Sequence, residues 1–128
     1  MAIRIVQLGS PRARTEGLRI GTVRRPPRGV PKAEFASRDF YDVWLPTLAP
    51  SESLVKSALA AKDEGAWRRF VRRYRAEMVR PDPRRVLDLL AALSHASHFS
   101  VGCYCRDEER CHRSILRALL AERRAAIR

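Results

Sequence analysis

The only three cysteines of this 128-residue chain lie close together near its C-terminal end. Cys103, Cys105 and Cys111 fall within nine residues, and His112 and Arg113 follow directly. Thiolates and imidazoles bind soft metal ions, and a thiolate beside a histidine can attack an electrophile. The segment is therefore the first candidate for a functional site.

Two interpretations of this cluster use the sulfur atoms themselves. In the first, Cys103, Cys105, Cys111 and His112 bind zinc, since these donor types suit a tetrahedral ion. The Cys-x-Cys spacing is tighter than usual, however, and adjacent Cys111 and His112 side chains would diverge on a helix. In the second, Cys103 or Cys111 is a catalytic nucleophile and His112 is its proton partner. No Asp or Asn that would orient the histidine can be identified from the sequence.

Two further interpretations give the sulfur atoms a secondary role. Arg106, Arg110 and Arg113 surround the cluster, and a helix is predicted to begin at its end. The free amides of that helix would favour a phosphate or carboxylate group. Alternatively, Cys103 and Cys111 are small buried apolar residues, and His112 packs beside them. Whether the chain catalyses a reaction stays open.

A second basic segment covers residues 24–32, in which Arg24, Arg28 and Lys32 are candidate anion-binding residues. Three prolines stiffen this loop, and a rigid loop loses little entropy when it binds a ligand. We expect it to meet the segment 103–113 in one electropositive pocket.

The net charge of +12, from 26 Lys+Arg against 14 Asp+Glu, favours an anionic partner. A phosphate-bearing small molecule or a nucleic acid would suit this charge. Only three of the basic residues are lysines, so a GC-rich coding bias is an equally good explanation for the excess of arginine. No motif for sequence-specific readout of nucleic acid is visible.

No apolar run approaches the roughly 18 residues that span a bilayer, and no secretory signal is visible at the N-terminus. We therefore expect no membrane partner. An odd number of clustered cysteines argues against a disulfide-stapled secreted scaffold and favours a cytoplasmic protein.

The hydrophobic pattern predicts a single α/β domain over residues 1–128. Strands are predicted at 3–8, 18–24, 40–45 and 99–104, and helices from Ser51 to about Gly65, at 66–79, 84–95 and 112–125. We expect a two-layer or three-layer domain with about four helices and a mostly parallel sheet, mixed if the first two strands pair antiparallel. His95 and His98 precede the last strand and are expected to lie far from the cysteines.

Several spacings resemble one known family. Arg24, Pro27, Arg28, Gly29 and Lys32 fit its R-x2-P-R-G-[IV]-x-K loop. In the predicted helix 66–79, the spacing W-x2-F-x3-Y-x2-E is matched by Trp67, Phe70, Tyr74 and Glu77. In both segments the chain resembles the YeaO-like group of the domain-of-unknown-function family numbered 488.

The cysteine segment resembles the other branch of that family, which carries C-x-E-x2-P-x2-C-H-R. Cys103, Cys111, His112 and Arg113 match it in register, while Cys105 stands in place of Glu and Glu108 in place of Pro. The resemblance implies a compact α/β domain and draws attention to the two loops. It implies no substrate, because the family is named for its unassigned role.

Overall fold

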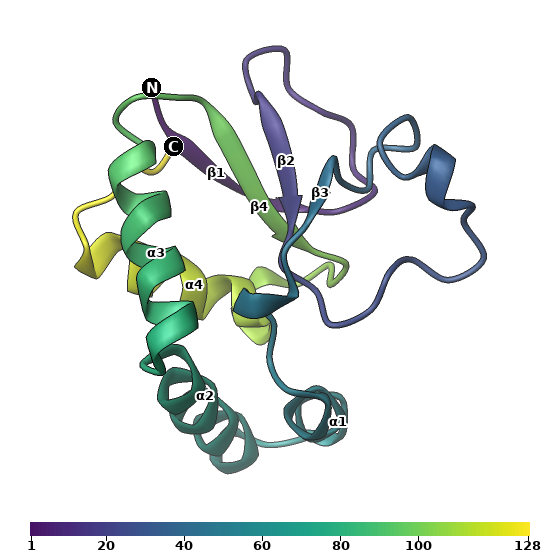
Figure 1. Cartoon of the computed structure of the whole chain (residues 1–128). Coiled ribbons are helices and arrows are strands. Elements are labelled where there is room, and N and C mark those ends of the chain that lie inside the picture. The colour runs from purple at the N-terminus through teal and green to yellow at the C-terminus, as the bar shows by residue number, and fades with distance from the viewer.

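A computed structural model describes all 128 residues of the chain (Figure 1). Four strands and four helices form the domain, and the prediction of an α/β fold is confirmed. The strands are β1 (Ile3–Gln7), β2 (Leu18–Gly21), β3 (Val43–Trp44) and β4 (Phe99–Cys103). The helices are α1 (Glu52–Ala60), α2 (Glu64–Met78), α3 (Pro81–Leu93) and α4 (His112–Glu122).

The strands run parallel in the order β1-β4-β2-β3. Ile3 pairs with Phe99 on one side of β4, and Ile20 pairs with Val101 on the other. The alternative of an antiparallel β1–β2 pair is therefore wrong, because β4 lies between these two strands. The five residues of β4 are all buried, as expected for a central strand of a parallel sheet.

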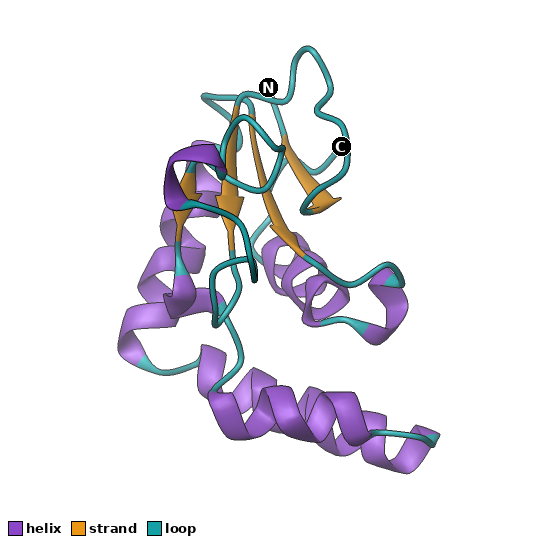
Figure 2. Ribbon diagram, turned by 90° about the vertical axis from the view of Figure 1, so that its right-hand side faces the viewer, coloured by secondary structure: helices purple, strands orange, loops and turns teal.

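Alternation along the strands separates an apolar face from a polar one. Ile3, Ile20, Phe99 and Val101 belong to a core that also contains apolar residues of all four helices. Residues on the opposite face include Arg19 and Ser100, which contact loops instead of helices. The helices therefore cover one face of the sheet, and α1 and α2 extend beyond the carboxyl ends of the strands (Figures 1 and 2).

The helices α2 and α3 begin where a capping contact or a first-turn proline allows it, and the prolines between them do not form a long break. The Asp63 carboxylate accepts a hydrogen bond from the Ala66 amide at 2.7 Å and caps α2, so Gly65 lies inside this helix. Pro81, which lies between the predicted helices 66–79 and 84–95, is instead the first residue of α3. Its ring needs no amide partner at that position and already has a helical φ.

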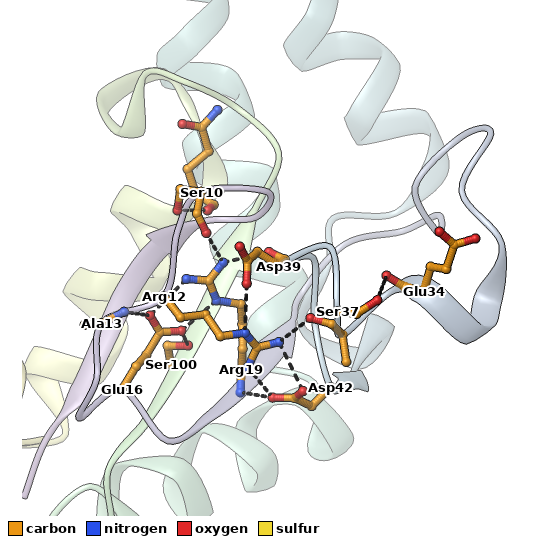
Figure 3. A network of polar contacts seen from close by, with 12 residues as sticks. Ser10, Arg12, Ala13, Glu16, Arg19, Glu34, Ser37, Asp39, Asp42 and Ser100 are labelled. Carbon is orange, nitrogen blue, oxygen red and sulfur yellow. Dashed lines mark hydrogen bonds and ion pairs between the residues drawn. The ribbon is translucent and has the colours of Figure 1, made fainter.

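A buried ion pair fixes the loops on the polar face of the sheet (Figure 3). The Arg19 guanidinium is fully buried, binds the Glu16 carboxylate at 2.6 Å, and donates to the carbonyl oxygens of Ser10 and Asp39. The Ser100 hydroxyl donates to the same Glu16 carboxylate at 2.7 Å. One arginine thus joins the segments around residues 10, 16 and 39 to the sheet.

The two ends of the chain meet at β1, where Ile3 bridges Ile127 (Figure 1). The Arg128 amide donates to the Ile3 carbonyl at 2.9 Å, and the Ile3 amide donates to the Ala126 carbonyl at 2.8 Å. No helix combines the length and apolar character that crossing a membrane requires.

Candidate functional site

The site lies at the carboxyl ends of β4 and β2, where ligands commonly bind parallel sheets. Cys103 is the last residue of β4 and is buried. Gly102 precedes it, and a Cβ there would meet the Val6 carbonyl oxygen at 2.7 Å. Because only glycine allows this approach, β1 and β4 stay close up to the residue that carries the thiol.

Cys111 and His112 converge because the helix begins between them. Cys111 is the N-cap of α4, with an extended backbone at φ −127° and ψ 151°, and His112 is the first helical residue. The Cys111 sulfur is therefore 3.8 Å from His112 Nδ1. The expectation that these neighbouring side chains diverge is wrong, since only one of them is on the helix.

The imidazole of His112 is buried and held in one orientation. Its Nε2 lies 2.7 Å from the Thr22 carbonyl oxygen, and the ring of Tyr74 packs edge-on with centroids 5.5 Å apart. A carbonyl oxygen only accepts hydrogen bonds, so Nε2 carries the proton. In the neutral ring Nδ1 is then the unprotonated nitrogen, and it faces the Cys111 sulfur.

Cys105 lies at the exposed side of the cluster, with its sulfur 3.8 Å from that of Cys103. The Cys103 thiol donates to this sulfur, which raises the pKa of Cys103 and lowers the pKa of Cys105. The nearby Arg113 charge lowers the pKa of Cys105 further. Contact with Cys103, then with His112, lowers the pKa of Cys111.

Arg113 is a buried cation without a carboxylate partner. Its side chain is 3% exposed, its Nη2 donates to the Cys105 carbonyl at 2.5 Å, and its Nε has no hydrogen-bond partner. A buried charge is costly unless it is compensated. The Arg113 charge helps to lower the pKa of Cys105 and that of Glu108, although Arg117, the salt-bridge partner of Glu108, lowers the pKa of Glu108 more.

Three buried side chains form a group that could hold a metal ion. The ligand atoms of Cys103, Cys111 and His112 all lie within 4.8 Å of one another. Cys105, the fourth predicted ligand, is outside this tight group but next to Cys103. His95 and His98 are elsewhere, as expected: His95 contacts the Arg124 carbonyl, and His98 precedes the opposite end of β4.

One pocket of about 770 Å³ brings together the two loops that the sequence singles out. Residues 23–28 line one side, residues 103–105 and 110–112 form another, and α1 supplies an apolar wall with Val55, Ala58 and Leu59. Its charged lining residues are Arg24, Arg25, Arg28, Lys56, Arg110 and Glu52. The lining therefore has an excess of positive charge over an apolar wall and a Cys–His floor.

The six predicted anion-binding residues have different surroundings. Arg28 lines the pocket and is exposed, whereas Arg24 also lines it but donates to the carbonyls of Pro46, Ala49 and Pro50. Arg110 is an ion-pair partner of Glu64 and lies 5.6 Å above the Trp67 ring. The other three are outside the lining: Lys32 and Arg106 are exposed, and Arg113 is buried behind Cys105.

Several important residues were missed by sequence reasoning. The Thr22 carbonyl that orients His112 is a backbone atom, so no residue type could have identified it. Lys56 and the apolar wall of α1 lie about 50 residues from the cysteines in the chain. Leu59 is 81% exposed, but this exposure is known only from the structure, so the sequence held no signal for the apolar wall.

Fold and site together define a small parallel α/β domain with a buried Cys–His group at the carboxyl ends of its strands. A family model described as the active DUF488-N3 subclade, DUF488-N3a, matches residues 3–124, and the chain belongs to this family. Membership agrees with the resemblance to family 488, while the YeaO-like subdivision stays a prediction. The comparisons found no match among curated proteins or solved structures.

Proposed function

We propose that the pocket binds a small phosphate-bearing ligand, with a nucleotide as the leading class. The observation that carries this proposal is that both basic loops line the same pocket above the Cys–His floor. Arg28 and Lys56 are exposed lining residues without an ion-pair partner, so their charges are available to a phosphate group. The apolar wall of α1 would contact the organic part of the ligand.

Calorimetric titration with a nucleoside monophosphate, its nucleoside and inorganic phosphate tests this proposal. We expect the monophosphate to bind more tightly than the nucleoside. The double variant Arg28→Ala/Lys56→Ala should weaken binding about tenfold or more, since a hydrogen bond to a charged group contributes about 1.5–3 kcal/mol. Binding should also weaken with added salt.

The control is Arg72→Ala/Arg73→Ala, which removes the same charge from the exposed face of α2. It should leave the affinity nearly unchanged. An equal loss in both double variants would show that only net charge matters, and no binding of the monophosphate at low salt would contradict the proposal.

A metal centre at the pocket floor is a second candidate, and zinc is the metal that the donors fit best. Two thiolates and one imidazole are common zinc ligands, and a site with three protein ligands leaves one position open. The contact that favours this candidate is His112 Nε2 to the Thr22 carbonyl, because metal-binding histidines commonly donate their second ring N–H to such a group. The description of the family as an active subclade agrees with a working site.

Elemental analysis of protein purified without chelators tests this candidate. We expect one zinc ion per chain, lost in Cys103→Ala and in His112→Ala, and kept in His95→Ala, which changes a histidine outside the site. A metal-free wild-type protein with native circular dichroism would contradict a metal centre. The same residues would then support a thiol enzyme, in which His112 Nδ1 accepts the Cys111 proton, and rapid alkylation of that thiol would be its first test.

A further inference from the structure

Cys105 differs from the other members of the cluster in position and exposure. Cys103, Cys111 and His112 are buried and belong to β4 or to the start of α4, whereas Cys105 is exposed on the loop between them. All four side chains line the pocket, and Cys105 is the exposed one. Of the four candidate ligands, it is the one that a ligand in the pocket can most easily displace.

The distance between the Cys103 and Cys105 sulfurs suits a shared metal ion. With metal–sulfur bonds of about 2.3 Å and a tetrahedral angle, two thiolates on one zinc ion lie about 3.8 Å apart. The two sulfurs are 3.8 Å apart. Cys105 is thus close enough to complete a site whose other ligands are Cys103, Cys111 and His112.

The charge of Arg113 gives an independent reason for a third thiolate. A divalent ion with three thiolates and a neutral imidazole has a net charge of −1, which the buried guanidinium neutralises. With only two thiolates, the ion and Arg113 together have an excess of one positive charge. Arg113 makes no salt bridge and its Nε is unsatisfied, while the nearby Glu108 is already paired with Arg117 at 2.6 Å. A thiolate at Cys105 would therefore compensate the buried guanidinium more directly than Glu108 does.

We propose that Cys105 is an exchangeable fourth metal ligand, which the oxyanion of a phosphate-bearing ligand replaces when it enters the pocket. The inference rests on both the phosphate-binding pocket and the metal centre of the proposed function. One sulfur–metal bond breaks and one oxygen–metal bond forms, with no change in oxidation state, and the released thiolate stays near Arg113. Both states supply the anion that the buried guanidinium requires, so Arg113 keeps a compensating charge throughout the exchange.

Cobalt(II) substitution tests this proposal, because sulfur-to-cobalt charge-transfer absorption increases with the number of bound thiolates. The full chain is loaded with cobalt, and inorganic phosphate or a nucleoside monophosphate is then added. We expect Cys105→Ala to keep cobalt but to lose about one third of the charge-transfer absorption, as three thiolates become two. Arg106→Ala, on the same exposed loop, should keep the wild-type spectrum. The anion should lower the wild-type absorption to the level of Cys105→Ala and leave the charge-transfer band of that variant unchanged.

Each other outcome has a distinct meaning. If the wild-type chain binds no cobalt, the metal centre itself is absent and the inference falls with it. If cobalt binds but Cys105→Ala has the wild-type spectrum, the metal centre stands and Cys105 is not a ligand. If the variant loses absorption but neither anion changes the wild-type spectrum, Cys105 is a fixed ligand, and exchange is contradicted.

Discussion

At the scale of single residues, two buried arginines differ in whether a carboxylate compensates their charge. Arg19 faces the Glu16 carboxylate at 2.6 Å, so its charge is compensated and it stabilises the fold. Arg113 is also buried, but it makes no salt bridge and donates to the Cys105 carbonyl beside the thiols. Among the chain's 23 arginines, sequence alone could not distinguish these two, because their difference depends on distant partners.

The Glu16 carboxylate should make stability depend on acid pH. Burial alone would raise the pKa of Glu16, but hydrogen bonds from Arg19 and Ser100 outweigh it and lower the pKa below the usual 4.5. Since the folded pKa lies below the unfolded one, this stabilisation is present above pH 4.5 and lost as the pH falls through the folded pKa.

We expect Glu16→Gln to lower the free energy of unfolding by about 3–5 kcal/mol at pH 7, because it leaves Arg19 buried without a counter-charge. Urea unfolding at pH 7 and pH 4 measures the change, and the variant should vary less with pH than the wild type. Asp88→Asn, in an exposed pair with Arg123, is the control and should change stability by at most about 1 kcal/mol. A variant at Glu16 as stable as the wild type would contradict the role of the buried pair.

At the scale of elements, strongly periodic segments could be predicted well. Helix α2 was predicted at 66–79 and occurs at Glu64–Met78, because Phe70, Tyr74 and Met78 repeat along one face. The start of α3 was predicted at residue 84, three residues too late, because the prolines at 81 and 83 lie in its first turn, where proline is tolerated. Strand pairing could not be predicted, because it depends on where β4 inserts between distant segments.

Helix capping gives a matched pair of variants at this scale. The Asp63 carboxylate accepts the Ala66 amide, so we expect Asp63→Ala to destabilise the protein by about 1 kcal/mol. Ser51 occupies the same position before α1, but its side chain makes no capping hydrogen bond, and Ser51→Ala should cost clearly less. Thermal unfolding compares the two variants. Equal losses, or a larger loss at Ser51, would show that the capping contact is not what stabilises α2.

The candidate site was predicted at the level of segments but not of contacts. Residue types drew attention to Cys103, Cys111 and His112, and the sulfur and nitrogen ligand atoms of these residues do converge. The convergence itself depends on the extended backbone of Cys111 and on the Thr22 carbonyl, neither of which a residue pattern encodes. Likewise, sequence could not show that Arg110 forms an ion pair with Glu64 while Arg28 lines the pocket without an ion-pair partner.

At the scale of the whole molecule, the candidate functional site lies at one end of the sheet. The pocket and the Cys–His group lie at the carboxyl ends of the strands, while the termini meet on β1 at the other end (Figure 1). The Arg25–Glu52 ion pair links the proline-stiffened loop to α1 across the pocket. Ligand binding should therefore affect the loops and α1 and leave the Arg19 network unchanged.

The most direct measurement of the central claim is a titration of isotope-labelled protein with a nucleoside monophosphate, followed by amide chemical shifts. We expect shifts confined to residues 23–28, to 103–112 and to α1, with saturation at one ligand per chain. Shifts spread over the exposed arginines of α2 and α3, without saturation, would contradict a defined phosphate-binding pocket.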